Sequence, residues 1–340
     1  MKIGIIGLPQ SGKATVFEAL THLFTSGAKG DARLGTVPVP DERLDRLTAM
    51  YNPAKTIPAQ VEYFLPGPGK KGDGEPGLWY QARDCDAVIH VVRNFGGYGF
   101  SDPTPLKDFN ALDQDIRFAD LVIVENRLER LLADHKRGKK INPEEQALLE
   151  ECRSHLEQEQ SLRRFPHITD SPLLRGFALL SAKPVLVLFN NPDDVDESPD
   201  VPELLEKEKC LVIRGKLEHE LAQMSEEDAR EFLEEFSISA SATDRVIKAS
   251  YQLLGLISFF TVGEDEVRAW TVVEGTPAQK AAGVIHTDMD KGFIRAEVIS
   301  YEALLEAGSH QEAKKRAALR LEGKTYQVQD GDIMEIRFNV

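Results

Sequence analysis

The amino-acid sequence predicts an α/β protein: a parallel, doubly wound sheet that carries an inserted helical hairpin and is followed by a compact α+β module. Three observations predict this arrangement. Apolar strand-like runs alternate with helical segments in the first part of the chain, a charged and leucine-punctuated segment follows, and short strands with tight turns fill the chain after Thr261.

Length and composition bound the class of protein. The 340 residues leave room for two or three domains. The net charge of -15 argues against broad adhesion to nucleic acid, although a local basic face would still bind it. Cys85, Cys152 and Cys210 lie far apart without metal-ligand spacing, as is typical of reduced thiols. Because the N-terminal apolar run is too short for a signal peptide and no segment reaches membrane-spanning length, we expect a soluble, cytoplasmic protein without membrane contact.

Apolar runs rich in β-branched residues predict the strands of the sheet. These runs are Met1–Ile6, Gln60–Leu65, Ala87–Arg93 and Pro184–Phe189. The segment Gly12–Phe24 is predicted to be a helix, because Val16, Leu20 and Phe24 recur every four residues. Strands that alternate with helices are expected to lie parallel, with helices on both faces of the sheet.

The charged segment from Asp120 to Arg164 predicts a pair of antiparallel helices. Gly138 and Asn142-Pro143 interrupt it in the middle. Val124, Leu128 and Leu131, spaced by four and then three, form the apolar seam of one helix. An ordinary solvated face explains the charges of this segment, and the tip between the helices is the one place where this acidic chain would touch an anionic partner. The basic residues of this hairpin tip are Lys136, Arg137, Lys139 and Lys140.

The C-terminal module alternates strands, turns and helices. Its predicted strands are Val267–Val273, Phe293–Ser300 and 333–338, with turns of sequence EGT and DGD between them. Its predicted helices are Tyr301–Ala307 and His310–Leu319.

The stretch GLPQSGKAT, Gly7 to Thr15, nearly matches the phosphate-loop pattern G-x-x-x-x-G-K-[ST]. The strand before it and the helix after it would direct backbone N–H groups and the positive helix end at one point, where phosphate oxygens bind. We therefore expect a nucleotide here, with a purely structural glycine turn as the alternative. The candidate binding residues in the loop are Gly7, Gln10, Ser11, Gly12, Lys13, Ala14 and Thr15.

The residues that normally hold Mg²⁺ are missing. In P-loop hydrolases a loop Ser or Thr and a strand-end Asp bind the ion. Here Ala14 takes the first position, and Leu65-Pro66 stand where the acid is expected. Mg²⁺ would then be held only by phosphates and water, so any hydrolysis is expected to be slow.

Asn190 and Asp193 follow the last predicted strand with the spacing of the guanine-reading pattern N-K-x-D. At the carboxyl end of a parallel strand, where ligands bind, an Asp can accept hydrogen bonds from the guanine N1–H and amino group. Asn191 replaces the Lys that would cover the ring. An ordinary polar turn is the alternative explanation.

These landmarks, in this order, resemble the YchF family of Obg-related P-loop NTPases, also called Obg-like ATPases. The resemblance covers nearly the whole chain. It is strongest over residues 261–300 (TVGEDEVRAW to RAEVIS) and 321–340 (LEGKTYQ to IRFNV), and it includes VPVPDERLDRL from Val37 to Leu47, AVIHVVR and the helical hairpin.

The resemblance implies a Ras-like P-loop NTPase core, an antiparallel coiled-coil insertion and a C-terminal TGS domain of β-grasp fold. The corresponding domains are 1–119 with 165–255, 120–164, and 256–340. It also implies ATP or GTP as ligand, Mg²⁺ and K⁺ for hydrolysis, and contact with a ribosome or another RNA-containing particle through the TGS domain and the hairpin tip. Many members prefer ATP because a Glu stands where Asp193 stands here.

The departures from the family pattern gather around the nucleotide. The family loop reads G-x-P-N-x-G-K-S-T, whereas this chain has Gln10 and Ala14 at the Asn and Ser positions. Three further elements differ: Lys29–Arg33 at the switch threonine, Leu65–Pro68 at D-x-A-G, and Arg214-Gly215 at the Ser-Ala pair. We expect a purine-nucleotide-binding regulatory factor with weak or lost hydrolysis. The alternative is an active ATP/GTP hydrolase that switches a translation-associated partner. A sugar or nucleotide kinase would need an acceptor-binding or catalytic-base motif, and none is evident.

Overall fold

The computed structural model describes residues 1–24, 32–67, 78–97, 99, 101–235 and 241–339. They form two compact units: Met1–Thr36 with Glu62–Val246, and Val37–Val61 with Ile247–Val340. The segments Lys29–Asp31 and Pro68, at which the sequence departs from its family, lie outside the described residues.

The first unit is built on a sheet in which β1, β4, β5, β6 and β7 pair in parallel, as the sequence predicts. Strand β1 pairs with β4 and β5, and β6 pairs with β5 and β7. Strands β5 and β6 are buried along almost their whole length, which explains their continuous apolar sequences. The strand order is β2 (Arg33–Pro38), β4 (Gln60–Leu65), β1 (Lys2–Ile6), β5 (Ala87–Arg93), β6 (Val185–Asn190) and β7 (Lys209–Ile213).

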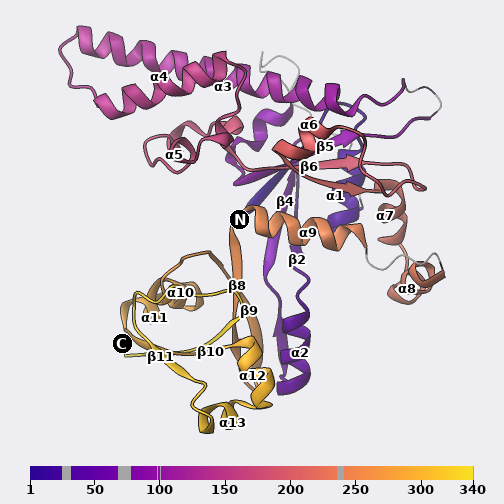
Figure 1. Ribbon diagram of the computed structural model, residues 1–340, viewed down its shortest axis with the longest axis vertical. Helices are drawn as coiled ribbons and strands as arrows, with labels where there is room; N and C mark the ends of the chain where they lie inside the picture. Colours follow the sequence, from indigo (N-terminus) through magenta and orange to yellow (C-terminus); the bar gives the residue numbers. More distant parts are fainter. Residues whose placement is uncertain (25–31, 68–77, 98, 100, 236–240, 340) are drawn as a thin grey trace. The chain divides into compact units, whose positions relative to one another are not determined.

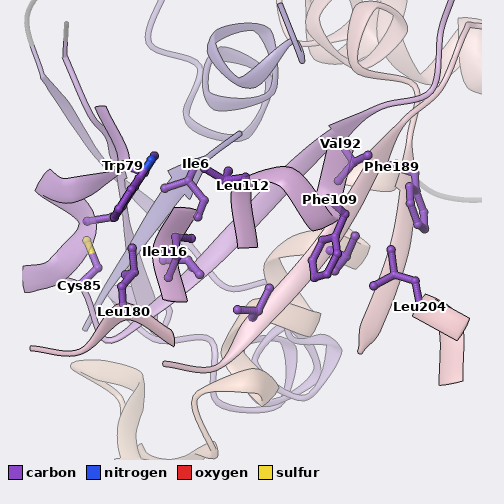
Figure 2. Close-up of a cluster of buried hydrophobic side chains, with 14 of the residues drawn as sticks. Ile6, Trp79, Cys85, Val92, Phe109, Leu112, Ile116, Leu180, Phe189 and Leu204 are labelled. Carbon is purple, nitrogen blue, oxygen red and sulfur yellow. The ribbon is translucent and has the colours of Figure 1, made fainter. Parts of the chain in front are cut away.

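The first long helix, α3 (Pro105–Lys136; Figure 1), contributes to the core of this unit from Phe109 onward. Its first half packs Phe109, Leu112 and Ile116 against apolar side chains of β1, β5 and β6 (Figure 2). The sequence analysis recognised helical character only from Asp120 onward. Phe109, Leu112 and Ile116 are spaced by three and four like the residues of the hairpin seam, so the sequence carried a helical signal for the first half that the prediction did not use.

The second half of α3 and helix α4 (Pro143–Glu157) form the predicted hairpin and lie side by side (Figure 1). The predicted seam is confirmed: Val124, Leu128 and Leu131 are buried. They share an apolar cluster with Leu149, Cys152 and Leu156 of α4. The Asn142 side chain caps α4 by accepting a hydrogen bond from the Glu144 N–H, and Gly138 adopts a φ of 80° in the turn.

Helix α1 (Lys13–Thr21) is shorter than the predicted Gly12–Phe24. His22 adopts a left-handed conformation with a φ of 54° and ends the helix, so Phe24 lies outside it and is exposed. The other helical elements of this unit are η1 (Leu78–Asp84), η2 (Leu162–Arg164), α5 (Pro166–Thr169), η3 (Arg175–Phe177), η4 (Leu180–Ala182), α6 (Pro202–Lys207), α7 (Gly215–Leu221), α8 (Glu226–Glu235) and the start of α9 (Ala242–Leu253).

The second unit contains a mixed sheet. The three strands predicted from sequence are confirmed as β9 (Glu266–Val273), β10 (Phe293–Ser300) and β12 (Asp332–Phe338), whereas β3, β8 and β11 were missed. The short β3 pairs in parallel with β9, so a segment from near the N-terminus completes this sheet. The strand order is β11 (Arg320–Glu322), β10, β12, β8 (Leu256–Val262), β9 and β3 (Lys55–Ile57).

Helices cover this second sheet. Helix α12 (Tyr301–Ala307) has the predicted bounds, but α13 (His310–Lys315) ends before Leu319, because Ala317 turns the chain with a φ of 54°. Helix α2 (Glu42–Tyr51) packs on β8 and β9. Helices α10 (Ala278–Ile285) and α11 (Thr287–Lys291) contact β9, β10 and β12. In the described part of the chain, no helix combines the length and the apolar character needed to span a membrane.

Candidate functional site

The loop between β1 and α1 has the backbone of a phosphate-binding turn. Gly7 has no room for a side chain, because a Cβ there would lie 2.5 Å from the Val91 carbonyl oxygen. Gly12 adopts a φ of 87°, and Gln10 takes a φ of 65° although it is not a glycine. Helix α1 starts directly after Gly12, so its first N–H groups point out at the loop.

Lys13 closes this loop on itself. Its ammonium group donates a hydrogen bond to the Leu8 carbonyl oxygen at 3.1 Å, and burial lowers its pKa. Ser11 is buried, and its hydroxyl has no hydrogen-bond partner within the described residues. Thr15 is half-buried on the first turn of α1. The predicted loop residues are therefore brought together around one turn, where the Lys13 ammonium and the first N–H groups of α1 lie close to a site for an anion.

The residues at the two usual Mg²⁺ positions do not fit the ion. Ala14 is exposed on the first turn of α1 and has no side-chain oxygen. Leu65 is buried at the end of β4. Gly67, two residues later, exchanges hydrogen bonds with the Gln81 side-chain amide at 3.3 and 3.1 Å. The Gln81 amide is thus held by a backbone peptide in this structure.

Asn190 at the end of β6 braces the phosphate loop. Its side-chain Nδ2 donates to the Ser11 carbonyl oxygen at 3.1 Å, and its Oδ1 accepts from the Gly215 N–H at 3.0 Å. The contact is so close that a Cβ on Gly12 would lie 2.1 Å from Asn190 Nδ2. Asn190 is buried, and its amide is occupied by these two backbone groups. It therefore joins the phosphate loop to the start of α7.

The two residues that follow differ in setting. Asn191 is buried: its Oδ1 accepts from Asn94 Nδ2 at 2.8 Å, and its Nδ2 donates to the carbonyl oxygens of Val195 and Glu197. It holds the turn after β6 and has no freedom to cover a base.

Asp193 is exposed, and its Oδ2 lies 3.4 Å from the Lys216 ammonium on α7. Its carboxylate stands at the same edge of the sheet as Asn190. Lys216 was missed by the sequence analysis, because only the fold brings it beside Asp193.

Helices α1 and α7 and strand β2 meet through ionic contacts near the loop. Glu18 on α1 accepts from Arg33 Nη1 at 2.6 Å and lies 3.0 Å from His219 Nε2. Burial raises the pKa of Glu18, but Arg33 and His219 lower it more, so its net pKa shift is downward. Glu18 is 15 positions from Arg33 and 201 positions from His219 in the sequence, so no local sequence pattern predicts these contacts.

Known proteins and a known structure are similar to this chain along nearly its whole length. A family model named YchF-GTPase_C and described as "Protein of unknown function (DUF933)" matches residues 256–339. "Ribosome-binding ATPase YchF" of Bacillus subtilis (strain 168) is 37% identical over 99% of this chain and 99% of its own length. The protein of the same name in Escherichia coli O157:H7 is 36% identical over 100% of this chain and 99% of its own length.

A solved structure agrees with these relatives. The Schizosaccharomyces pombe YchF GTPase superposes with a TM-score of 0.85 at 29% identity, and the match covers 99% of this chain and 97% of that chain. The parallel sheet, the helical hairpin and the C-terminal β module thus follow one known architecture along the whole chain. By full-length sequence identity and by fold, this chain belongs to the YchF family.

Proposed function

We propose that this chain binds a purine nucleotide, GTP or ATP, on its phosphate loop and acts as a ribosome-linked regulatory factor with slow or lost hydrolysis. The observation that carries the proposal is the preformed loop between β1 and α1. Its carbonyl at Ser11 is held by Asn190, and the first N–H groups of helix α1, which starts directly after Gly12, are left for an anion. Relatives that this chain matches over 99% of their length are named ribosome-binding ATPases, and the similar solved structure is named a GTPase.

The nucleotide phosphates would occupy the loop, and Lys13 would leave the Leu8 carbonyl to bind them. An ammonium–phosphate contact is charge-assisted and stronger than the neutral hydrogen bond that it replaces. Asp193 would read the base, and Asn190 would keep the loop and the base-reading turn in register. The residues proposed to form the nucleotide site are Gly7, Gln10, Ser11, Gly12, Lys13, Ala14, Thr15 and Asp193, with Asn190 holding the loop from behind.

Slow hydrolysis follows from the residues at the metal positions. With Ala14 and Leu65 there, Mg²⁺ would have no oxygen ligand from these two side chains and would be bound by phosphate and water. The alternative, an active hydrolase that switches a translation-associated partner, predicts ordinary turnover despite these residues. Turnover therefore separates the two.

The proposed partner is a ribosome or another RNA-containing particle, and the proposed location of the protein is the cytoplasm. With a net charge of -15, such contact has to be local. The hairpin tip is one candidate surface, because its four basic side chains are all exposed. The C-terminal TGS-like module of residues 256–340 is the other. The division into a nucleotide-binding core (1–119 with 165–255), a hairpin (120–164) and this module is part of the proposal.

Calorimetry with ATP, GTP, ADP and GDP, with and without Mg²⁺, tests the proposal. We expect binding of at least one purine nucleotide, a small effect of Mg²⁺, and at least a tenfold loss of affinity in Lys13→Ala, about 1.4 kcal/mol or more. Lys280→Ala, a lysine of the second unit, is the matched control and should bind like the wild type. Absence of heat with all four nucleotides, or equal affinity of Lys13→Ala, would refute the proposal.

Phosphate release measured in the same preparations tests the catalytic part. We expect turnover well below about 1 s⁻¹, the low end of ordinary enzymes. Ala14→Ser restores a hydroxyl at an exposed position and should increase the effect of Mg²⁺ on nucleotide affinity. Wild-type release at about 1 s⁻¹ or faster that disappears in Lys13→Ala would establish the active hydrolase instead.

A further inference from the structure

Helix α9 begins on a buried carboxylate that comes from another helix. Glu218 of α7 is 2% exposed. Its carboxylate oxygens accept hydrogen bonds from the Ala242 N–H at 2.9 Å, from the Thr243 N–H at 3.3 Å and from the Thr243 hydroxyl at 2.7 Å. A fourth comes from the Ser241 hydroxyl at 2.6 Å. A negative charge at a helix N-terminus is stabilised by the orphan N–H groups and by the helix dipole.

The other end of α7 is tied to the phosphate loop. The Gly215 N–H, which opens α7, donates to Asn190 Oδ1, and Asn190 Nδ2 donates to the Ser11 carbonyl oxygen. Two side chains, Asn190 and Glu218, therefore connect the loop to the start of α9 through a helix of only seven residues. Each link is a hydrogen bond between buried groups, which is costly to leave unmade.

Helix α9 continues from the first unit into the second. Its residues up to Val246 belong to the first unit, and those from Ile247 onward belong to the second. Near its end the Tyr251 hydroxyl is bonded to the Ile257 carbonyl and to the Ser258 hydroxyl at the start of β8, and to the Thr271 hydroxyl on β9. The C-terminal β sheet thus receives the far end of the same helix.

We propose that Glu218 is a positioning residue that couples the phosphate loop to the C-terminal module through α9. The inference rests on the proposed nucleotide binding. A phosphate would draw Lys13 away from the Leu8 carbonyl and reset the loop that presents the Ser11 carbonyl to Asn190. The change in that contact passes to Gly215, along α7 to Glu218, and so to α9 and the sheet that Tyr251 touches. Nucleotide binding then stabilises α9 and β8–β9. If nucleotide changes the affinity of the C-terminal module for a ligand by some factor, that ligand changes the affinity for nucleotide by the same factor.

Amide hydrogen exchange of the full chain tests the coupling, with the nucleotide that calorimetry shows to bind. In the wild type we expect added nucleotide to slow exchange about fivefold or more in residues 242–253 and in 256–273. Glu218→Gln keeps the size of the side chain but removes its charge and replaces one acceptor oxygen by an amide NH2 group, which can only donate. This variant should lose both responses, to less than about twofold, while still binding nucleotide.

Two further variants make the test specific. Glu220→Gln is the same chemical change on an exposed position of α7 and should respond like the wild type. Tyr251→Phe should keep the response of 242–246 but lose that of 256–273, which also covers the case in which Glu218→Gln does not fold. Nucleotide that binds without slowing exchange in the wild type, or equal responses in Glu218→Gln and Glu220→Gln, would overturn the coupling alone. No binding heat at all would remove the proposed function and this inference together.

Discussion

Asn190 and Asp193 stand three residues apart, yet they have different tasks. Asn190 is buried, and its side-chain amide is hydrogen-bonded to the Ser11 carbonyl and to the Gly215 N–H, so it supports the site from behind. Asp193 is exposed and paired with Lys216 at 3.4 Å, an ion pair that water screens and that contributes little. Its carboxylate is therefore available to a ligand at little cost.

Base preference is predicted at the scale of this residue. Guanine offers an N1–H and an amino group to Asp193, whereas adenine has no N1–H and would leave the carboxylate partly unpaired, which costs about 1–3 kcal/mol. We expect GTP to compete better than ATP, and Asp193→Ala to remove the difference. The neighbouring Asp194→Ala is the matched control. Competition binding that ranks ATP first, with the same ranking in Asp193→Ala, would contradict this prediction.

His90 is predicted to make the protein sensitive to mild acid. It is buried on β5 and stacks on Phe109 with 5.0 Å between ring centroids. It also lines a cavity of about 240 Å³ beside Ser11 of the phosphate loop. Burial lowers its pKa from 6.5 to about 4; Asp113 opposes this shift and Arg163 adds to it. Between pH 6.5 and about pH 4, His90 is protonated in the unfolded chain but neutral in the folded chain. The free energy of unfolding therefore decreases as the pH falls toward 4.

The free energy of unfolding at pH 7 and pH 5 measures this effect. The two pKa values correspond to a loss of about 2 kcal/mol at pH 5 from His90. His90→Phe keeps an aromatic ring on Phe109 but does not titrate, so its loss should be smaller by about that amount. Denaturant curves in which the variant and the wild type lose the same free energy would show that His90 does not carry the acid sensitivity.

At the scale of elements, the helical hairpin combines a fixed base with an exposed tip. Near its base, Arg163 contacts Asp113 of α3 at 2.9 Å and Glu208 at 2.7 Å, and all three side chains are largely buried. Burial raises the pKa of Asp113, but Arg163 and the Ser161 hydroxyl lower it more, so it remains charged in the pair. Breaking such a pair on one side is strongly destabilising, because a buried charge is left over. The hairpin is thus anchored firmly enough to present its tip.

Contact between the hairpin tip and a ribosome is predicted to depend on salt and charge. Lys136, Arg137, Lys139 and Lys140 are all exposed, and Lys139 is in addition paired with Asp134 at 2.8 Å. Changing all four basic residues to Glu should lower cosedimentation with ribosomes at low salt, because local attraction becomes repulsion. Nucleotide affinity should not change. The charge-neutral swap Arg153→Lys, on α4 away from the tip, is the control. An unchanged pellet fraction for the four-Glu variant would exclude the tip as a contact.

At the scale of the whole molecule, the C-terminal module is not a contiguous stretch of sequence. Residues Val37–Val61 belong to the same unit and supply both an edge strand and a helix. Leu44 and Leu47 of α2 are buried. Arg43 is bound to Asp41 and to Asp330, and these two carboxylates outweigh the effect of burial and raise its pKa.

A fragment of residues 242–340 is therefore predicted to be poorly folded alone. The fragment lacks Leu44 and Leu47, whose burial contributes about 3–6 kcal/mol. That is a large part of the stability of a small domain. We expect the fragment to bind a hydrophobic dye and to melt below the full chain. A peptide of residues 37–61 added in trans should reverse both effects, and its Leu44→Asp, Leu47→Asp version should not. A fragment that melts sharply without the peptide would refute this view of the unit.

Sequence by itself determined what local patterns encode. Continuous apolar runs identified the buried strands of the parallel sheet, because strands covered on both faces carry no polar alternation. Spacing of four and three identified the hairpin seam, and two glycines with a lysine identified the loop whose backbone the structure then showed. Each of these signals lies within a few neighbouring residues, because local backbone geometry and burial restrict which residue types can occupy those positions.

Only the tertiary structure decided how these parts are connected. Asn190 meets Ser11 across 179 positions of sequence, and Glu218 caps a helix 24 positions away. The first half of α3 joins the core, and Val37–Val61 joins the C-terminal unit. The local sequence does not record which distant segment a polar or apolar side chain contacts, because many partners would satisfy the same local pattern. The fold alone selects the partner that each buried polar group finds.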